Sequence, residues 1–253
     1  MNMYEGHLGS DHPELVHVML LLAAACGSMG DGARRRELLE RAVKARETSD
    51  HPDLAKLLSQ LATAVGEAGD AARKKELLLR VLLMREKALG MHHHELAATI
   101  VNLGNTYGLL GDVVKKRELL ERALVIQQTH YGCEHTEVAA VLVNLGNAHG
   151  ALGDANKKKE LLEKALRIQE DAASRSGGVD CSDVTRTMVS TIVNLGNVWG
   201  DLGNAALKKE FLERALQLQE ALLKDKASPA SFAELATILH NLGAACVRML
   251  MPQ

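Results

Sequence analysis

The sequence predicts an all-α protein, a solenoid of antiparallel helix pairs with about eleven helices. Three observations lead to this fold class. A string of twelve residues recurs along the chain, the apolar residues around each copy follow one helix face, and five of the six copies end at Gly followed by Asp or Asn. Internal repeats of this length are typical of solenoids, in which each unit packs mainly on its neighbours.

The first helix of each pair, which we call helix A, contains the recurring string. It reads VNLGNTYGLLGD at 101–112, VNLGNAHGALGD at 143–154 and VNLGNVWGDLGN at 193–204, with degraded copies at 20–31, 59–70 and 240–251. Apolar residues recur at spacings of three, four and three, as in Ile100, Leu103, Tyr107 and Leu110. We call the central leucine of each copy the reference leucine: Leu22, Leu61, Leu103, Leu145, Leu195 and Leu242.

The ends of helix A are predicted by turn chemistry. Pairs of Gly with Asp or Asn close the first five copies: Gly30-Asp31, Gly69-Asp70, Gly111-Asp112, Gly153-Asp154 and Gly203-Asn204. Glycine adopts the left-handed conformation that ends a helix, and Asp or Asn caps the next one. Three of the four prolines stand where a helix A should begin, because proline is tolerated in a first turn: Pro13, Pro52 and Pro229.

The second helix of each pair, helix B, reads KKRELLERALVIQ at 115–127, KKKELLEKALRIQ at 157–169 and LKKEFLERALQLQ at 207–219. Its Leu and Ala residues form an apolar ridge, and its Lys and Glu side is a solvated convex face. One helix pair buries too little apolar surface to offset the entropy of ordering it. Neighbouring pairs must therefore stack.

We expect an N-terminal tail at 1–10 and a single solenoid at 11–253. Its repeats span approximately 11–49, 50–90, 91–132, 133–180 and 181–227, with a half repeat at 228–251. The link at 170–183 is rich in Ser and Gly and is predicted to be a mobile loop. No helix B follows the last helix, 230–250, so its end exposes apolar surface unless the chain continues or this end docks on another molecule: Met249, Leu250 and Met251.

Composition limits the class of function. Thirty basic and thirty-two acidic residues give a net charge of −2 with no lopsided half, which argues against nucleic-acid binding. No apolar run is long enough for a membrane helix, and no targeting segment is visible, so we expect no direct membrane insertion. The four cysteines form no C-x-x-C motif, which favours free thiols in a reducing intracellular compartment, the cytoplasm by default.

The recurring string, followed by Gly-Asp and by a helix with an LLxxAL run, resembles the tetratricopeptide repeat. The spacing of 42 residues between Leu61, Leu103 and Leu145, with the link sequences HPE and HPD, resembles the long repeats of kinesin light chains. The resemblance covers about residues 11–250. It implies a right-handed superhelix in which the A helices line a concave groove.

The resemblance also implies the residues that face this groove. In peptide-binding members of the family, an Asn of helix A holds the ligand backbone or its terminal carboxylate. The predicted groove residues are Val101, Asn102, Asn105, Gly108, Val143, Asn144, Asn147, Gly150, Val193, Asn194, Asn197, Gly200, Lys56 and His240. Lys56 is the only cation that we find at a groove position, which argues against a clamp for acidic C-terminal tails.

Two alternatives remain open at these positions. The Asn residues either read a ligand or join adjacent helices. Gly108, Gly150 and Gly200 either open the groove to an approaching backbone or relieve crowding against helix B, whose first turn carries a long basic side chain in place of the family's usual small residue: Arg35, Lys74, Lys116, Lys158 and Lys208. Close packing on helix B accounts for a second set of glycines: Gly104, Gly146, Gly196 and Gly243.

No residues form a nucleophile–base constellation, so we expect no enzyme activity and no cofactor. The run His92-His93-His94 could hold a metal ion, but His93 shares its repeat position with His12, His51 and His135 and is better explained as a link residue, so we expect no metal site. We therefore predict a non-catalytic scaffold that binds a partner protein in the groove. The alternative is a constitutive structural subunit of a large assembly, docked by its ends and edges.

Overall fold

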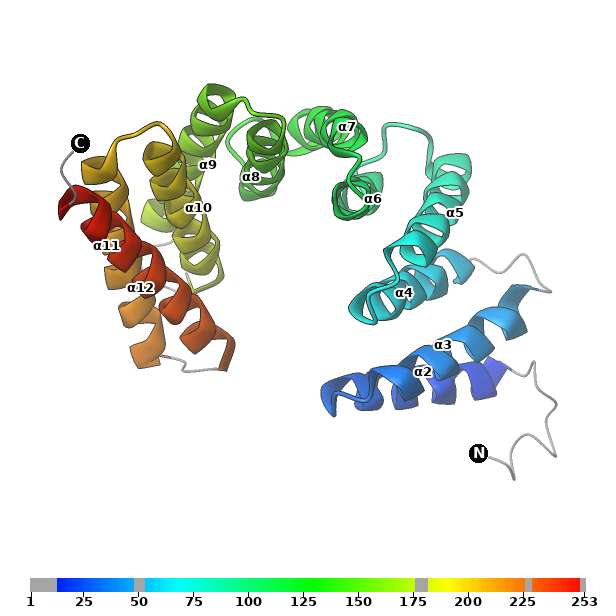
Figure 1. Cartoon of the computed structure of the whole chain (residues 1–253). Helices are drawn as coiled ribbons and strands as arrows, with labels where there is room; N and C mark the ends of the chain where they lie inside the picture. The colour runs from blue at the N-terminus through cyan, green and yellow to red at the C-terminus, as the bar shows by residue number, and fades with distance from the viewer. Residues whose placement is uncertain (1–12, 48–52, 176–181, 226–228, 251–253) are drawn as a thin grey trace. The chain divides into compact units, whose positions relative to one another are not determined.

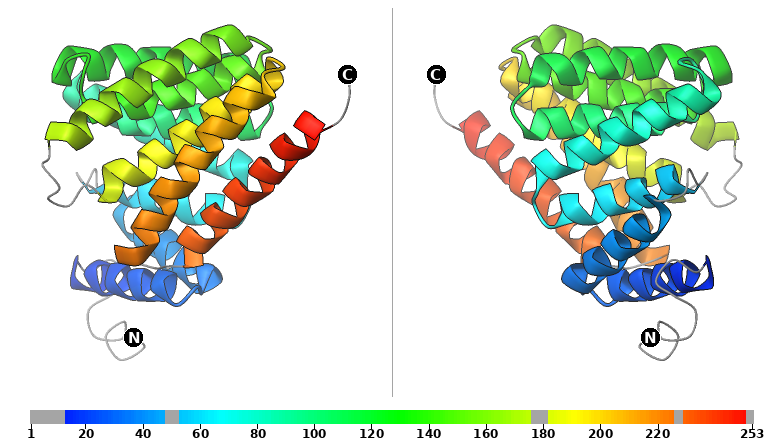
Figure 2. Two further views of the ribbon diagram at one scale, coloured as in Figure 1. Left: turned by 90° about the vertical axis from the view of Figure 1, so that its left-hand side faces the viewer. Right: turned by 90° about the vertical axis from the view of Figure 1, so that its right-hand side faces the viewer.

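The computed structural model describes residues 13–47, 53–175, 182–225 and 229–250. Within them the chain forms eleven α-helices and no strand, which confirms the predicted fold class. Figures 1 and 2 show the order of these helices along the chain. The A helices are α2 (Pro13–Ser28), α4 (Leu54–Glu67), α6 (Leu96–Leu109), α8 (Thr136–Ala151), α10 (Ser182–Asp201) and α12 (Pro229–Leu250). The B helices are α3 (Gly32–Glu47), α5 (Ala71–Leu89), α7 (Val113–Tyr131), α9 (Ala155–Arg175) and α11 (Ala205–Asp225).

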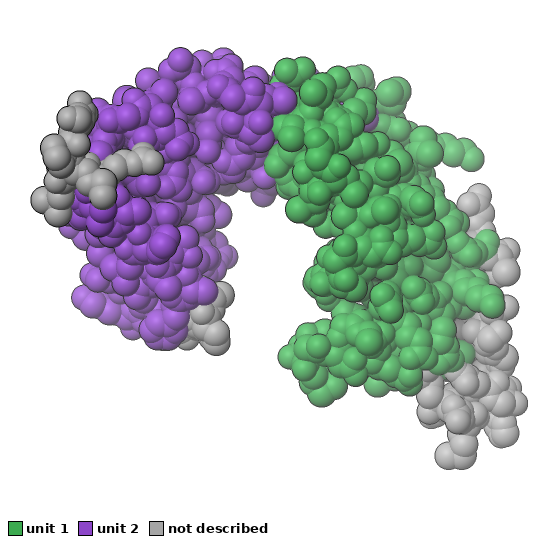
Figure 3. Space-filling model, viewed as in Figure 1, with its two compact units in different colours: residues 1–119 green, residues 120–253 purple. Residues whose placement is uncertain are grey.

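The helices pack in chain order, each on its neighbours. Helix α2 packs on α3, α4 on α5, α8 on α9 and α10 on α11, and successive pairs meet through α3 with α4, α5 with α6, α9 with α10 and α11 with α12. The chain divides into two compact units, residues 1–119 (unit 1) and residues 120–253 (unit 2), which Figure 3 colours separately. The expected single solenoid over 11–253 stays a prediction.

Four of the six reference leucines lie in the core, as their phase predicts, and Leu242 is half-buried. Leu61, Leu103, Leu145 and Leu195 are each at most 4% exposed. Leu22, in the first described helix, differs because its side chain is 40% exposed. In unit 2, the core cluster joins Leu195 to residues of the flanking helices, including Leu162 of α9 and Ala215 of α11. Burial of these leucines is the main source of stability in such a stack.

The turns between helices A and B have the predicted chemistry. The five closing glycines have left-handed φ angles between 79° and 87°. The amide of the following residue donates to a carbonyl five residues earlier, as Asp154 N does to His149 O at 3.0 Å. The same residue caps helix B, as Asp154 Oδ1 does by accepting from Lys157 N at 2.9 Å. Equivalent caps lie at Asp31, Asp70, Asp112 and Asn204.

The structure confirms two predicted helix starts and shortens one predicted loop. Pro13 and Pro229 are the first residues of α2 and α12, as expected, and Pro52 lies outside the described residues. The predicted loop at 170–183 is too long: α9 continues through Arg175 and α10 begins at Ser182, because the sequence from Glu170 to Arg175 has no helix-breaking residue. Residues 176–181 lie outside the described part of the chain.

Candidate partner-binding surface

A crevice between two A helices of unit 2 contains part of the predicted groove. Its volume is about 210 Å³. Helix α10 contributes Val193 and Asn194, both predicted groove residues, together with Val189 and Ser190. Helix α12 supplies the opposite wall: Glu234, Thr237 and Ile238. The crevice therefore combines an apolar lining with hydroxyl, amide and carboxylate groups.

A second crevice lies between two A helices of unit 1. Its volume is about 240 Å³, and it contains Lys56, the predicted groove cation. Helix α2 contributes Val16, His17 and Leu20. The other lining residues come from the start and middle of α4 and from the end of α3: Asp53, Leu57, Gln60 and Arg46.

The two crevices occupy the same place in the repeat. On the first helix of each crevice, His17 and Ser190 stand five residues before a reference leucine, and Leu20 and Val193 stand two residues before it. On the second helix of each crevice, Asp53 and Glu234 share a repeat position, eight residues before Leu61 and Leu242. A surface between successive A helices therefore recurs in both units, and we call each such surface an A-helix crevice.

The remaining predicted groove residues lie on A helices but line neither crevice. Asn105, Asn147 and Asn197 are half-buried, and His240 is exposed. Val143 packs against the core cluster of unit 2, as Val193 of the unit 2 crevice also does, so the methyl groups of both have a structural role. Asn144 donates through Nδ2 to Ala140 O at 3.0 Å within its own helix, which is not the helix-to-helix link considered from the sequence.

The structure gives Gly108, Gly150 and Gly200 a packing role within their own helix pairs. A Cβ atom at these positions would lie 2.7, 2.5 and 2.6 Å from the Cδ atoms of Lys116, Lys158 and Lys208. The lysine stems thus lie against the glycines, which is the crowding-relief alternative. Burial lowers the pKa of the Lys116 ammonium. A contribution of these glycines to partner binding stays a prediction.

The second set of glycines divides into two cases. Gly146 and Gly196 pack closely on helix B, since a Cβ atom would lie 3.3 Å from Lys158 O and 3.3 Å from Lys208 O, respectively. Gly243 does not, because no atom lies within 4 Å of its Cβ position. The prediction of close packing is therefore wrong for Gly243, since none of the described residues forms a helix B against α12.

Sequence reasoning missed part of both crevices. Glu234 accepts a hydrogen bond through Oε2 from Gln219 Nε2 at 3.0 Å, which fixes it at the edge of the unit 2 crevice. Arg46 comes from helix B, whereas the sequence analysis considered only the A helices as sources of groove cations. The shared repeat position of Asp53 and Glu234 is the signal that could have identified the facing wall.

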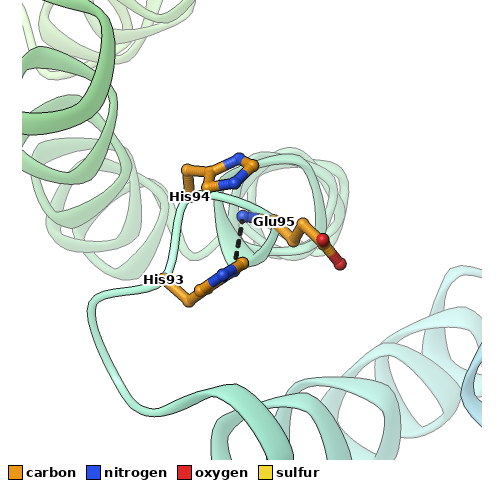
Figure 4. Close-up of side chains that lie close together, drawn as sticks. All are labelled: His93, His94 and Glu95. Carbon is orange, nitrogen blue, oxygen red and sulfur yellow. Dashed lines mark hydrogen bonds between the residues drawn. The ribbon is translucent and has the colours of Figure 1, made fainter.

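The histidine cluster has the structural role expected of a link residue. His93 Nδ1 accepts from Glu95 N at 3.4 Å, and His135 Nδ1 accepts in the same way from Glu137 N at 3.2 Å. Ligand atoms of His93, His94 and Glu95 lie within 4.8 Å of one another. However, Figure 4 shows the Glu95 carboxylate pointing away from both imidazole rings.

Two other predictions concern membrane insertion and the end of the last helix. No helix in the described part of the chain is both long and apolar enough to cross a membrane. Of the predicted end-docking residues, Met249 and Leu250 belong to α12, but their side chains are not described, and Met251 lies outside the described residues.

Repeated helix pairs, left-handed glycine turns and A-helix crevices define a helical-repeat protein. The sequence profile of the tetratricopeptide repeat matches residues 54–95, 96–137, 138–175 and 189–229, which is more than half of the chain. The chain therefore belongs to the tetratricopeptide repeat family. Repeats of this family form protein–protein interaction scaffolds, and this is the general class of function that membership indicates.

Solved structures agree with this assignment. BtubC (BKLC) from P. vanneervenii is 22% identical with a TM-score of 0.69, and the match covers 85% of this chain and 83% of that one. A putative kinesin light chain from Podosopora anserina with nearly identical TPR-like repeats is 25% identical with a TM-score of 0.66, covering 86% and 100%. The predicted likeness to kinesin light chain repeats is thus confirmed. A search of curated proteins gave no significant match.

Proposed function

We propose that this protein is a non-catalytic scaffold that binds a segment of a partner protein in its A-helix crevices. The observation that carries the proposal is the recurrence of a crevice at the same repeat position in both units, with predicted groove residues in each. Each crevice is a concave surface that combines apolar and polar groups, as binding sites do.

The chemistry of the unit 2 crevice suits a mixed polar and apolar segment. Val193, which is half-buried, offers an apolar side chain to a partner above the buried Val189 and Ile238. The amide of Asn194 can accept from and donate to a peptide backbone beside it. Ser190 and Thr237 add hydroxyl groups at the same crevice. In unit 1, Lys56 and Arg46 make the corresponding surface more basic, so the two crevices favour different partner side chains.

Partner capture tests the proposal. The double variant Lys56→Ala with Asn194→Ala removes one polar side chain from each A-helix crevice, and capture of the partner by the tagged protein should be lost while helicity is retained. Asn156→Ala is the matched control, because Asn156 is exposed on helix B of the fourth pair. Unchanged capture by the double variant, measured by quantitative mass spectrometry, would contradict groove binding.

A second candidate function is a structural subunit of a large assembly, docked by its ends and edges. The exposure of Phe232, Leu239 and Val247 on the last helix favours it. Gel filtration of native lysate distinguishes the two. A scaffold with exchangeable partners elutes largely on its own, whereas a constitutive subunit elutes only within a large particle.

A further inference from the structure

Helix α12 has the sequence of a helix A, but none of the described residues covers the face that normally receives helix B. In α10 this face comprises Ile192, Gly196 and Gly200, all buried beneath α11. The equivalent residues of α12 are Leu239, Gly243 and Val247. Leu239 is 49% exposed, whereas Ile192 is 0% exposed.

The glycines confirm that this face is open. A Cβ atom at Gly196 would contact Lys208 O and Phe211 Cβ of α11, both at 3.3 Å, whereas a Cβ atom at Gly243 would contact nothing within 4 Å. Val247 and Phe232 are also more than half exposed. Figure 2 shows α12, in red, at the edge of unit 2 with α10 and α11 on one side of it. The face is therefore an apolar stripe along the helix.

The other helix pairs indicate what kind of element covers such a face. Helices α5, α9 and α11 each pack on the preceding helix A with an apolar ridge. In α11 the ridge includes Leu212 and Ala215, both 0% exposed, and in α9 it includes Leu162 and Ala165, also 0% exposed. An amphipathic helix with a Leu-x-x-Ala ridge is thus the element that this face accepts.

Val247 determines which residue the covering helix can carry at one position. In α4, α8 and α10 the equivalent residue is Gly66, Gly150 or Gly200, and a lysine stem of helix B lies against it. A Cβ atom there would come within 2.7 Å of the lysine Cδ atom. Valine has a branched Cβ and leaves no room for that stem. The covering helix must therefore carry a small residue opposite Val247.

Glu220 indicates that the covering helix carries a positive charge. In unit 2, Arg214 of α11 donates to Glu170 of α9, and in unit 1, Arg80 of α5 donates to Glu47 of α3. Each ion pair joins one helix B to the next. Glu220 has the same repeat position as Glu170, is exposed, and forms no ion pair with the described residues. The arginine stands six residues after the stem lysine, at 80 after 74 and at 214 after 208.

We propose that the Leu239, Gly243 and Val247 face of α12 docks an amphipathic helix of a partner protein. This helix carries a small residue opposite Val247, an arginine six residues later that pairs with Glu220, and a Leu-x-x-Ala ridge between the helices. The site is separate from the A-helix crevices and does not depend on the groove function.

A peptide derived from the chain itself provides the probe. Residues 205–225 with Lys208→Ala have the required ridge, small residue and arginine. The labelled peptide should bind the full chain about tenfold more tightly than the unmodified 205–225 peptide, because overpacking against Val247 costs about 1–3 kcal/mol. Fluorescence anisotropy measures both affinities. Equal affinities, or no binding of either peptide, would overturn the proposal.

Variants of the full chain locate the binding site. Leu239→Lys should abolish peptide binding. Glu220→Arg should weaken it about threefold, and a peptide with Arg214→Glu should restore it, as expected for an exposed ion pair. Lys56→Ala with Asn194→Ala, the variant of the A-helix crevices, should leave peptide binding unchanged, so failure of the groove proposal stays distinguishable. Peptide binding that survives Leu239→Lys would overturn the proposed site. If the chain self-associates and Leu239→Lys removes this self-association, the face binds a second copy of the chain instead.

Discussion

Gly196 and Gly243 occupy the same position of the repeat, one residue after the reference leucine, in opposite surroundings. Gly196 lies against the backbone of α11, and Gly243 faces open space. Alanine is favoured over glycine inside a helix by about 1 kcal/mol. The surroundings therefore decide the sign of the substitution at each site.

We predict that Gly243→Ala stabilises the protein by about 1 kcal/mol through helix propensity. Gly196→Ala should destabilise it by about 1 kcal/mol, because the added methyl group displaces a helix backbone that cannot move as a flexible side chain does. Thermal unfolding followed by far-UV circular dichroism gives both signs. A rise in Tm for both variants would contradict the packing described here.

At the lysine stems, the same reasoning predicts that substitutions of the glycine and of the lysine are energetically coupled. Gly150→Ala alone should leave stability nearly unchanged, because the gain in helix propensity is offset by displacement of the Lys158 stem. With Lys158→Ala in place, Gly150→Ala should stabilise by about 1 kcal/mol. A double-mutant cycle in urea measures the coupling, and strict additivity would be inconsistent with the contact.

At the scale of elements, the turn between α8 and α9 is the clearest case of local sequence setting structure. Gly153 has a φ of 87°, a conformation that costs other residues about 1–2 kcal/mol. Asp154 caps α9 through Lys157 N. We predict that Asp154→Ala lowers the free energy of unfolding by about 1 kcal/mol. Asn156→Ala, two residues later and exposed, serves as the control, and an equal loss in both would argue against a capping role.

The turns, the helices and the core phase were predictable from sequence because each depends on residues close together in the chain. The loop at 170–183 was overestimated, since Ser and Gly in its second half dominated the composition while Glu170–Arg175 continues α9. Lys56, Val193 and Asn194 were found because they share a phase with the recurring string. Arg46 and Glu234 were missed because they reach the crevices from a helix B and from an earlier turn of the next helix A.

At the scale of the whole molecule, stability in a repeat stack is the sum of local terms and contacts between neighbours. The chain has one tryptophan, Trp199, which lies in unit 2 with Lys159 Nζ 4.8 Å from its ring centroid. Tryptophan fluorescence therefore reports on unit 2, whereas circular dichroism reports on all helices. The two signals separate the responses of the units.

Leu58 is fully buried in unit 1, and Leu58→Ala should cost about 2–5 kcal/mol. We predict that this variant shifts the urea transition seen by circular dichroism more than the transition seen by Trp199 fluorescence. Leu212→Ala in unit 2 should shift the fluorescence transition strongly. Equal shifts of both signals in both variants would show that the chain unfolds as one cooperative body.

Site-specific photo-crosslinking tests the binding role of the A-helix crevices most directly. A photoreactive amino acid replaces Ser190, which lines the unit 2 crevice, or Glu163, which is exposed on helix B of the fourth pair. The account predicts a covalent product with a partner polypeptide from position 190 and none from position 163. A product from position 163 alone would place the partner on the B helices and contradict the account.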